Sequence, residues 1–174
     1  FKDPRTSLLL PFWKKVFSDL GYDVHYIFVL RNPISVAKSL YRRDGIVEIK
    51  GFLLWVKYVL SAIPECEPTK TQLIDYDQLF FETRTKLLHI ADCLNIVESS
   101  QMHKELDTYT SEFLTTELRH NVSTLNELNS SASAPNIVKA IYRCLAVAAA
   151  KQVFISKEQL QKFIEELAYI GPLL

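Results

Sequence analysis

The hydrophobic pattern of the chain is most continuous over residues 24–30, where Val, Ile and aromatic side chains occupy both faces of an extended segment. A short run of this composition predicts a strand that is buried in a parallel sheet. Arg31 follows it directly, and Asn32 and Pro33 then form the N-cap and first-turn pair of a helix. Residues 72–75, QLID, predict a second and shorter strand.

Apolar residues recur with helical spacing over most of the remaining chain. The predicted helices span residues 5–20, 33–43, 52–63, 76–94, 136–154 and 157–170. Helices and strands therefore alternate in the first half, which is typical of an α/β fold whose parallel sheet is flanked by helices. Residues 129–135, NSSASAP, predict a loop before a closing pair of helices.

The composition excludes several classes of protein. The chain has 174 residues, 48% hydrophobic and 23% charged, with 20 basic and 20 acidic side chains. These values are ordinary for one globular domain. A neutral chain has no overall reason to bind nucleic acid or an anionic membrane, so any anion site must be local. No apolar run reaches the roughly 18 residues of a membrane span.

The cysteines and histidines indicate neither a disulfide framework nor a metal site. Cys66, Cys93 and Cys144 lie far apart without a CxxC pair, and the four histidines lack metal-ligand spacing. We therefore expect no bound metal and a reducing, cytoplasmic environment.

Arg31 and Ser39 are the first candidates for chemistry. An Arg at a strand end and a hydroxyl two turns into the next helix can converge on one phosphate, close to the free N–H groups of the helix start. Alternatively, Arg31 pairs with a carboxylate and Ser39 is a small helix-packing residue.

Two further positions carry open alternatives. Lys2 and Asp3 either bind an anion and act as a base at the mouth of the sheet, or belong to a solvated chain end in which Asp3 caps the helix that Pro4 begins. Tyr76 follows the second strand directly and either stacks on a purine or belongs to the core.

Three segments together resemble the sulfotransferases that use 3′-phosphoadenosine 5′-phosphosulfate (PAPS), in particular bacterial members of that family. Residues 31–39, RNPISVAKS, resemble the family's 3′-phosphate-binding motif. Residues 2–11, KDPRTSLLLP, resemble its Lys-x-His-x-x-x-x-Leu-Leu-Pro segment, and residues 74–96 resemble its Tyr-Glu-Asp-Leu strand-to-helix segment. Residues 113–123, FLTTELRHNVS, are similar to the bacterial members.

The resemblance implies one sulfotransferase domain with a P-loop-NTPase-like fold, in which residues 1–96 form the cofactor-binding α/β core and residues 97–174 a mostly helical closing region. The chain contains no glycine-rich phosphate cradle, and the family's phosphate loop would precede the first residue. We therefore expect the C-terminal part of such a domain, without its N-terminal phosphate-loop segment.

The resemblance also assigns roles to residues. Arg31 and Ser39 would hold the 3′-phosphate of PAPS and of its product, 3′,5′-diphosphoadenosine. Tyr76 would lie against the adenine. Lys2 would stabilise charge near the transferring sulfuryl group.

The implied reaction is sulfuryl transfer to a hydroxyl or amine, and a carbohydrate, a lipid and a small metabolite are equally plausible acceptors. Pro4 stands where cytosolic members carry a catalytic His, so Asp3 is the nearest candidate base. The alternative is a catalytically inactive sulfotransferase-like module that binds nucleotide or a partner. A nucleotide kinase is disfavoured, because a kinase needs no dedicated 3′-phosphate pocket.

Overall fold

A computed structural model describes residues 3–114 and 122–170. In these ranges the protein is mostly helical, with a small parallel sheet formed by β1 (Tyr26–Leu30) and β2 (Thr71–Asp75). The α-helices are α1 (Leu10–Asp19), α2 (Pro33–Asp44), α3 (Glu48–Ala62), α4 (Tyr76–Phe81), α5 (Thr83–Cys93), α6 (Ser100–Thr108), α7 (Leu125–Ser130), α8 (Asn136–Ala150) and α9 (Lys157–Ile170). The short helical turns are η1 (Pro4–Ser7), η2 (Ile63–Glu65), η3 (Pro68–Lys70) and the π-helical η4 (Tyr109–Phe113).

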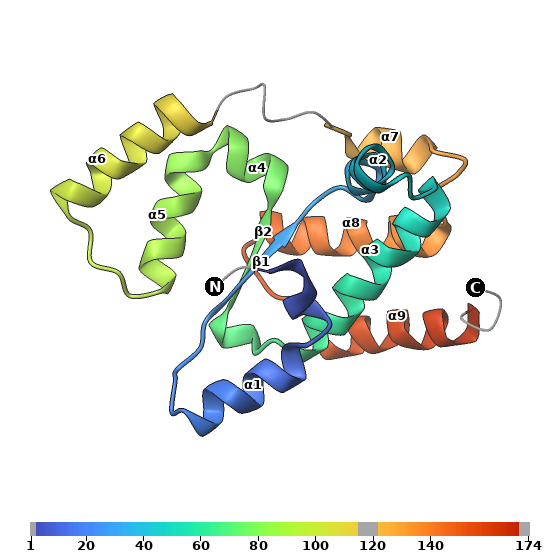
Figure 1. The fold of residues 1–174 in the computed structure, drawn as a ribbon, viewed down its shortest axis with the longest axis horizontal. Helices are drawn as coiled ribbons and strands as arrows, with labels where there is room; N and C mark the ends of the chain where they lie inside the picture. Colours follow the sequence, from blue (N-terminus) through green and yellow to red (C-terminus); the bar gives the residue numbers. More distant parts are fainter. Residues whose placement is uncertain (1–2, 115–121, 171–174) are drawn as a thin grey trace.

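The two strands lie near the middle of the molecule and the helices are unevenly distributed around them (Figure 1). Helices α5 and α6 extend on one side of the sheet, whereas α2, α3, α8 and α9 gather on the other. The described residues thus form an α/β unit in the loose sense: a parallel strand pair surrounded by helices. A complete P-loop-type sheet is not present among them.

Local signals explain several boundaries. Asn32 caps α2, and Gly45 ends it with a φ of +68°, a left-handed conformation that glycine adopts without strain. The predicted helix over 5–20 is divided into η1 and α1. The predicted helix over 76–94 is also divided, because the Thr83 hydroxyl donates to the carbonyls of Leu79 (2.8 Å) and Phe80 (3.0 Å) at the end of α4.

The expectation that the first strand is buried on both faces is wrong for β1. Leu30 is buried, and Tyr26 and Phe28 pack against the core, but Ile27 and Val29 are 47% and 50% exposed. Successive side chains of a strand point to opposite faces, so one face of β1 meets the helices and the other is open in the described structure.

The main core lies between the sheet and helices α3 and α8. The largest of its fully buried hydrophobic side chains are Leu30, Phe52, Val56, Ile63, Leu128, Val138, Ile141 and Leu145. Helix α2 packs on α3 so closely that a Cβ atom at Gly51 would lie 3.0 Å from Ala37. Within the described ranges, none of the helices combines the length and the hydropathy that crossing a bilayer requires.

Candidate functional site

The carboxyl ends of the two strands bring Arg31 and Tyr76 together. Leu30 pairs with Asp75 in the parallel register, so the next residue of each strand leaves the sheet at the same edge. The Cζ atom of Arg31 lies 4.9 Å from the centroid of the Tyr76 ring, which is a cation–π contact. Both residues are half-buried. Two residues that are 45 positions apart therefore form one surface at the edge where parallel sheets commonly bind ligands.

Asn32 fixes the turn that carries Arg31. Its side chain is fully buried, and Oδ1 accepts a hydrogen bond from the Ile34 N–H at 3.0 Å. Its Nδ2 donates to the carbonyls of Ser123 (2.9 Å) and Thr124 (3.1 Å). One amide thus starts α2 and ties it to the segment that precedes α7.

Asp75 fixes the turn that carries Tyr76. One carboxylate oxygen, Oδ1, accepts from the N–H groups of Asp77 (2.9 Å) and Gln78 (3.0 Å), which caps α4. The other oxygen accepts from the Tyr142 hydroxyl at 3.2 Å. Burial, followed by the charge of Asp75, raises the pKa of Tyr142, so this hydroxyl remains a donor throughout the neutral range.

Ser39 lies on α2, about two turns beyond its N-cap, and is half-buried. Ser35 is one turn earlier on the same face, and its fully buried hydroxyl has no hydrogen-bond partner among the described residues. This face of α2 therefore carries two serine hydroxyls one turn apart, of which Ser35 is buried and Ser39 is partly exposed.

Asp3 is hydrogen-bonded and paired with a cation, so it is not placed as a free base. It caps η1: its Oδ1 accepts from the backbone N–H of Arg5 at 2.8 Å, and its carboxylate pairs with the Arg5 guanidinium at 2.6 Å. The Asp3 carboxylate is thus engaged both as a cap and as the partner of a guanidinium. Lys2 lies outside the described residues, and so do residues 115–121 of the segment 113–123 that is similar to bacterial sulfotransferases.

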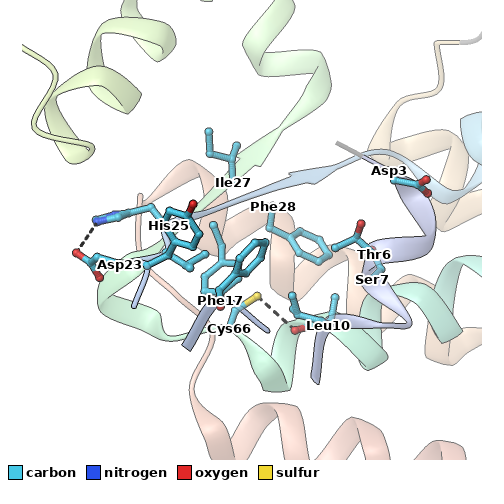
Figure 2. A pocket seen from close by; sticks show the side chains of 14 residues that line it. Asp3, Thr6, Ser7, Leu10, Phe17, Asp23, His25, Ile27, Phe28 and Cys66 are labelled. Atoms are coloured by element: carbon cyan, nitrogen blue, oxygen red, sulfur yellow. Dashed lines mark hydrogen bonds and ion pairs between the residues drawn. The ribbon is translucent and has the colours of Figure 1, made fainter. Parts of the chain in front are cut away.

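A hollow of about 520 Å³ runs along β1, between the strand and the η1–α1 segment. Figure 2 shows Asp3 at one end of it, Asp23 and His25 at the other, and Phe28 and Leu10 between them. Cys66 also lines the hollow and donates to the carbonyl of Ala62 at 3.3 Å. Burial raises the pKa of this thiol to about 11, so it is a poor nucleophile at neutral pH.

Sequence reasoning named Arg31, Ser39 and Tyr76 as candidate residues but did not name Tyr142. The position of Asp75, after a strand and before a helix, is a local N-cap signal. No local signal identifies Tyr142 as its partner, because the two residues are 67 positions apart. In the described ranges, no group of three His, Cys, Asp or Glu side chains is arranged to hold a metal ion.

Comparison with known proteins yields no relative. No family model matches the chain, and neither the curated proteins nor the solved structures contain a match to it.

Proposed function

We propose that this protein binds PAPS and transfers its sulfuryl group to a hydroxyl or amine of an acceptor. The observation that carries the proposal is the position of the Arg31 guanidinium, held over the Tyr76 ring at the carboxyl edge of two parallel strands. A planar cation beside an aromatic face suits a phosphorylated purine nucleotide, because the cation can bind a phosphate and the ring can stack on the base. The resemblance of residues 31–39 and 74–96 to sulfotransferase segments points to the same nucleotide and to a P-loop-like sulfotransferase fold.

The residues at this edge fit the nucleotide in three respects. Arg31 offers a fork of N–H donors for the 3′-phosphate, and Ser39, on α2, offers a hydroxyl. Tyr76 offers an aromatic ring for the adenine. The contact between Arg31 and Tyr76 restrains the guanidinium before ligand arrives, which lowers the entropic cost of binding.

The nucleotide, when bound, supplies the sulfuryl group, and the protein's part is to orient donor and acceptor and to stabilise charge. Lys2 is proposed to place a cation near the transferring group. Asp3 is the proposed base, on condition that it leaves Arg5 when the acceptor binds. Carbohydrate, lipid and small-metabolite acceptors are all compatible with the proposal. The free thiols of Cys66, Cys93 and Cys144 support a cytoplasmic location.

Calorimetric titration tests the proposal directly. We expect the protein to bind 3′,5′-diphosphoadenosine more tightly than 5′-AMP. Arg31→Ala should weaken binding of the diphosphate by roughly 2–4 kcal/mol, the scale for leaving a bound phosphate without its charged partner. The same change should leave the affinity for 5′-AMP nearly unaltered.

Arg143→Ala is the matched control, because Arg143 is exposed on α8 and its removal changes the net charge equally. Equal affinity for the two nucleotides, or an equal loss in both variants, would overturn the assignment of Arg31 to a 3′-phosphate.

A second candidate is a nucleotide-binding module without catalytic activity. The pairing of Asp3 with Arg5 favours it, since this carboxylate caps a turn and neutralises a neighbour. A module of this kind should bind 3′,5′-diphosphoadenosine with the same Arg31 dependence. It should form no sulfated product from PAPS with any hydroxyl or amine acceptor.

A further inference from the structure

The two turns at the carboxyl edge of the sheet are connected from behind by side chains of α3 and α8. The indole Nε1 of Trp55, on α3, donates a hydrogen bond to the carbonyl of Arg31 at 3.0 Å. Trp55 is 6% exposed, and a largely buried indole N–H of this kind usually finds a protein partner, as it does here. The backbone of Arg31 is therefore held in place independently of its guanidinium.

Tyr142, on α8, extends this connection to the second strand. Its ring meets the Trp55 ring edge-on, with centroids 6.3 Å apart and planes at 65°. Its hydroxyl donates to Asp75 Oδ2 at 3.2 Å. Asp75 immediately precedes Tyr76 and caps the helix that Tyr76 begins.

These contacts form a closed circuit. The Arg31 backbone bonds to Trp55, the Trp55 ring contacts the Tyr142 ring, and the Tyr142 hydroxyl bonds to the Asp75 carboxylate. Asp75 caps α4, which begins at Tyr76, and the Tyr76 ring contacts the Arg31 guanidinium. Asp75 is itself buried, and a buried carboxylate that loses a donor is costly to retain in place. Removal of the Tyr142 hydroxyl should therefore displace the turn at Asp75 and Tyr76 relative to Arg31.

We propose that Trp55 and Tyr142 are positioning residues that set the distance between the Arg31 guanidinium and the Tyr76 ring, and so determine recognition of the nucleotide. This inference rests on the proposed function. It gives α8, within the helical C-terminal region, a part in the nucleotide site that no local feature of its sequence indicates.

The test compares Tyr142→Phe with Ile141→Val, a conservative change at the adjacent and fully buried position of α8. Each variant is titrated with 3′,5′-diphosphoadenosine at a temperature where it is fully folded. We expect the dissociation constant of Tyr142→Phe to rise at least about tenfold, since it loses a hydrogen bond to a charged group. Ile141→Val should bind like the parent, although it too is less stable.

Amide hydrogen exchange provides a readout that needs no nucleotide. Tyr142→Phe should accelerate exchange at Asp77 and Gln78, whose N–H groups bond to Asp75, whereas Ile141→Val should leave both rates unchanged relative to its global stability. Trp55→Phe serves as a second variant, because it keeps a ring but removes the donor to Arg31, and we expect it to weaken binding as well.

The outcomes separate the two proposals. If the parent protein binds no nucleotide, the proposed function fails. The structural connection between Tyr142 and the turn at Asp75 is then tested by the exchange rates alone. If the parent binds 3′,5′-diphosphoadenosine, and Tyr142→Phe and Trp55→Phe each bind it as tightly as the parent does, the positioning role is overturned while the nucleotide site remains. Unchanged exchange at Asp77 and Gln78 in Tyr142→Phe overturns the connection in either case.

Discussion

At the scale of single residues, Asn32 shows how one buried side chain can serve two structures. It accepts from the first turn of α2 and donates to two carbonyls of the segment before α7. A carboxylate at this position could keep the first role but not the second, because it has no N–H to donate. The amide is therefore the group that satisfies all three partners.

Two substitutions separate these roles. Asn32→Ala removes the cap and the amide donor to the Ser123 and Thr124 carbonyls, of which Thr124 still accepts from the Leu128 N–H, so the free energy of unfolding should fall by roughly 2–4 kcal/mol. Asn32→Ser retains a capping oxygen and should cost about half as much. Urea denaturation measures both values. Equal destabilisation by the two variants would show that the cap contributes nothing.

At the scale of elements, the packing of α2 on α3 depends on the missing side chain of Gly51. A Cβ atom there would lie 3.0 Å from both Cα and Cβ of Ala37, closer than ordinary van der Waals contact. Glycine disfavours the interior of a helix by about 1 kcal/mol relative to alanine. The close approach of the two helices explains why a poor helix former occupies the fourth position of α3.

Gly51→Ala should therefore destabilise the protein by about 1–2 kcal/mol, because overpacking outweighs the gain in helix propensity. In the double variant Gly51→Ala with Ala37→Gly, the close contact with the Cβ of residue 37 is removed and only the contact with its Cα remains. The double variant should be more stable than the sum of the single changes predicts, which thermal or urea unfolding of all four proteins would reveal. Strict additivity would mean that α2 and α3 can move apart freely.

The elements also show what the sequence can and cannot predict. Both ends of α2 were predictable, because the Asn32 cap and the Gly45 stop are local signals. The proximity of Arg31 and Tyr76 could also be predicted from the sequence, since each directly follows a strand of a parallel pair.

Other features depend on geometry that no local pattern contains. The break at Glu82 depends on where the Thr83 hydroxyl finds its acceptors, and the open face of β1 depends on which elements cover the sheet. The partners of Asn32 and Asp75 lie 91 and 67 positions away. The roles of Arg31, Ser39 and Tyr76 in cofactor binding, and those of Lys2 and Asp3 in catalysis, stay predictions.

At the scale of the whole molecule, one part of the loss of stability at alkaline pH should be traceable to a buried thiol, that of Cys66. Cys66 belongs to a small cluster with Leu10 and Ala62 beside the sheet. Burial raises the pKa of its thiol from 9.0 to about 11. Between these values the folded protein retains a proton that the unfolded chain has lost, so stability must fall as pH rises through this window.

Urea denaturation of the parent and of Cys66→Ala at pH 8, 9, 10 and 11 checks this expectation. The parent should lose more stability than the variant between pH 9 and pH 11, and the two should lose similar amounts below pH 9. Tyr142, whose pKa is also raised, adds to the loss in both proteins at higher pH. Parallel curves for the two proteins over the whole range would show that Cys66 titrates alike in the folded and unfolded states.

The hydrogen bonds from Asn32 to Ser123 and Thr124, and from Tyr142 to Asp75, also have a kinetic consequence. Each closes a loop of more than sixty residues. The chain must lose the conformational entropy of that loop before the hydrogen bond can form and compensate for it. A ribosome synthesises Arg31 and Asn32 early, but their turn lacks its partners until Ser123 and Thr124 have been added to the chain. The turn at Asp75 waits longer still, until Tyr142 of α8 has left the exit tunnel. The edge that carries Arg31 and Tyr76 is thus encoded in the first half of the chain and completed only by the second, which makes it a late product of folding.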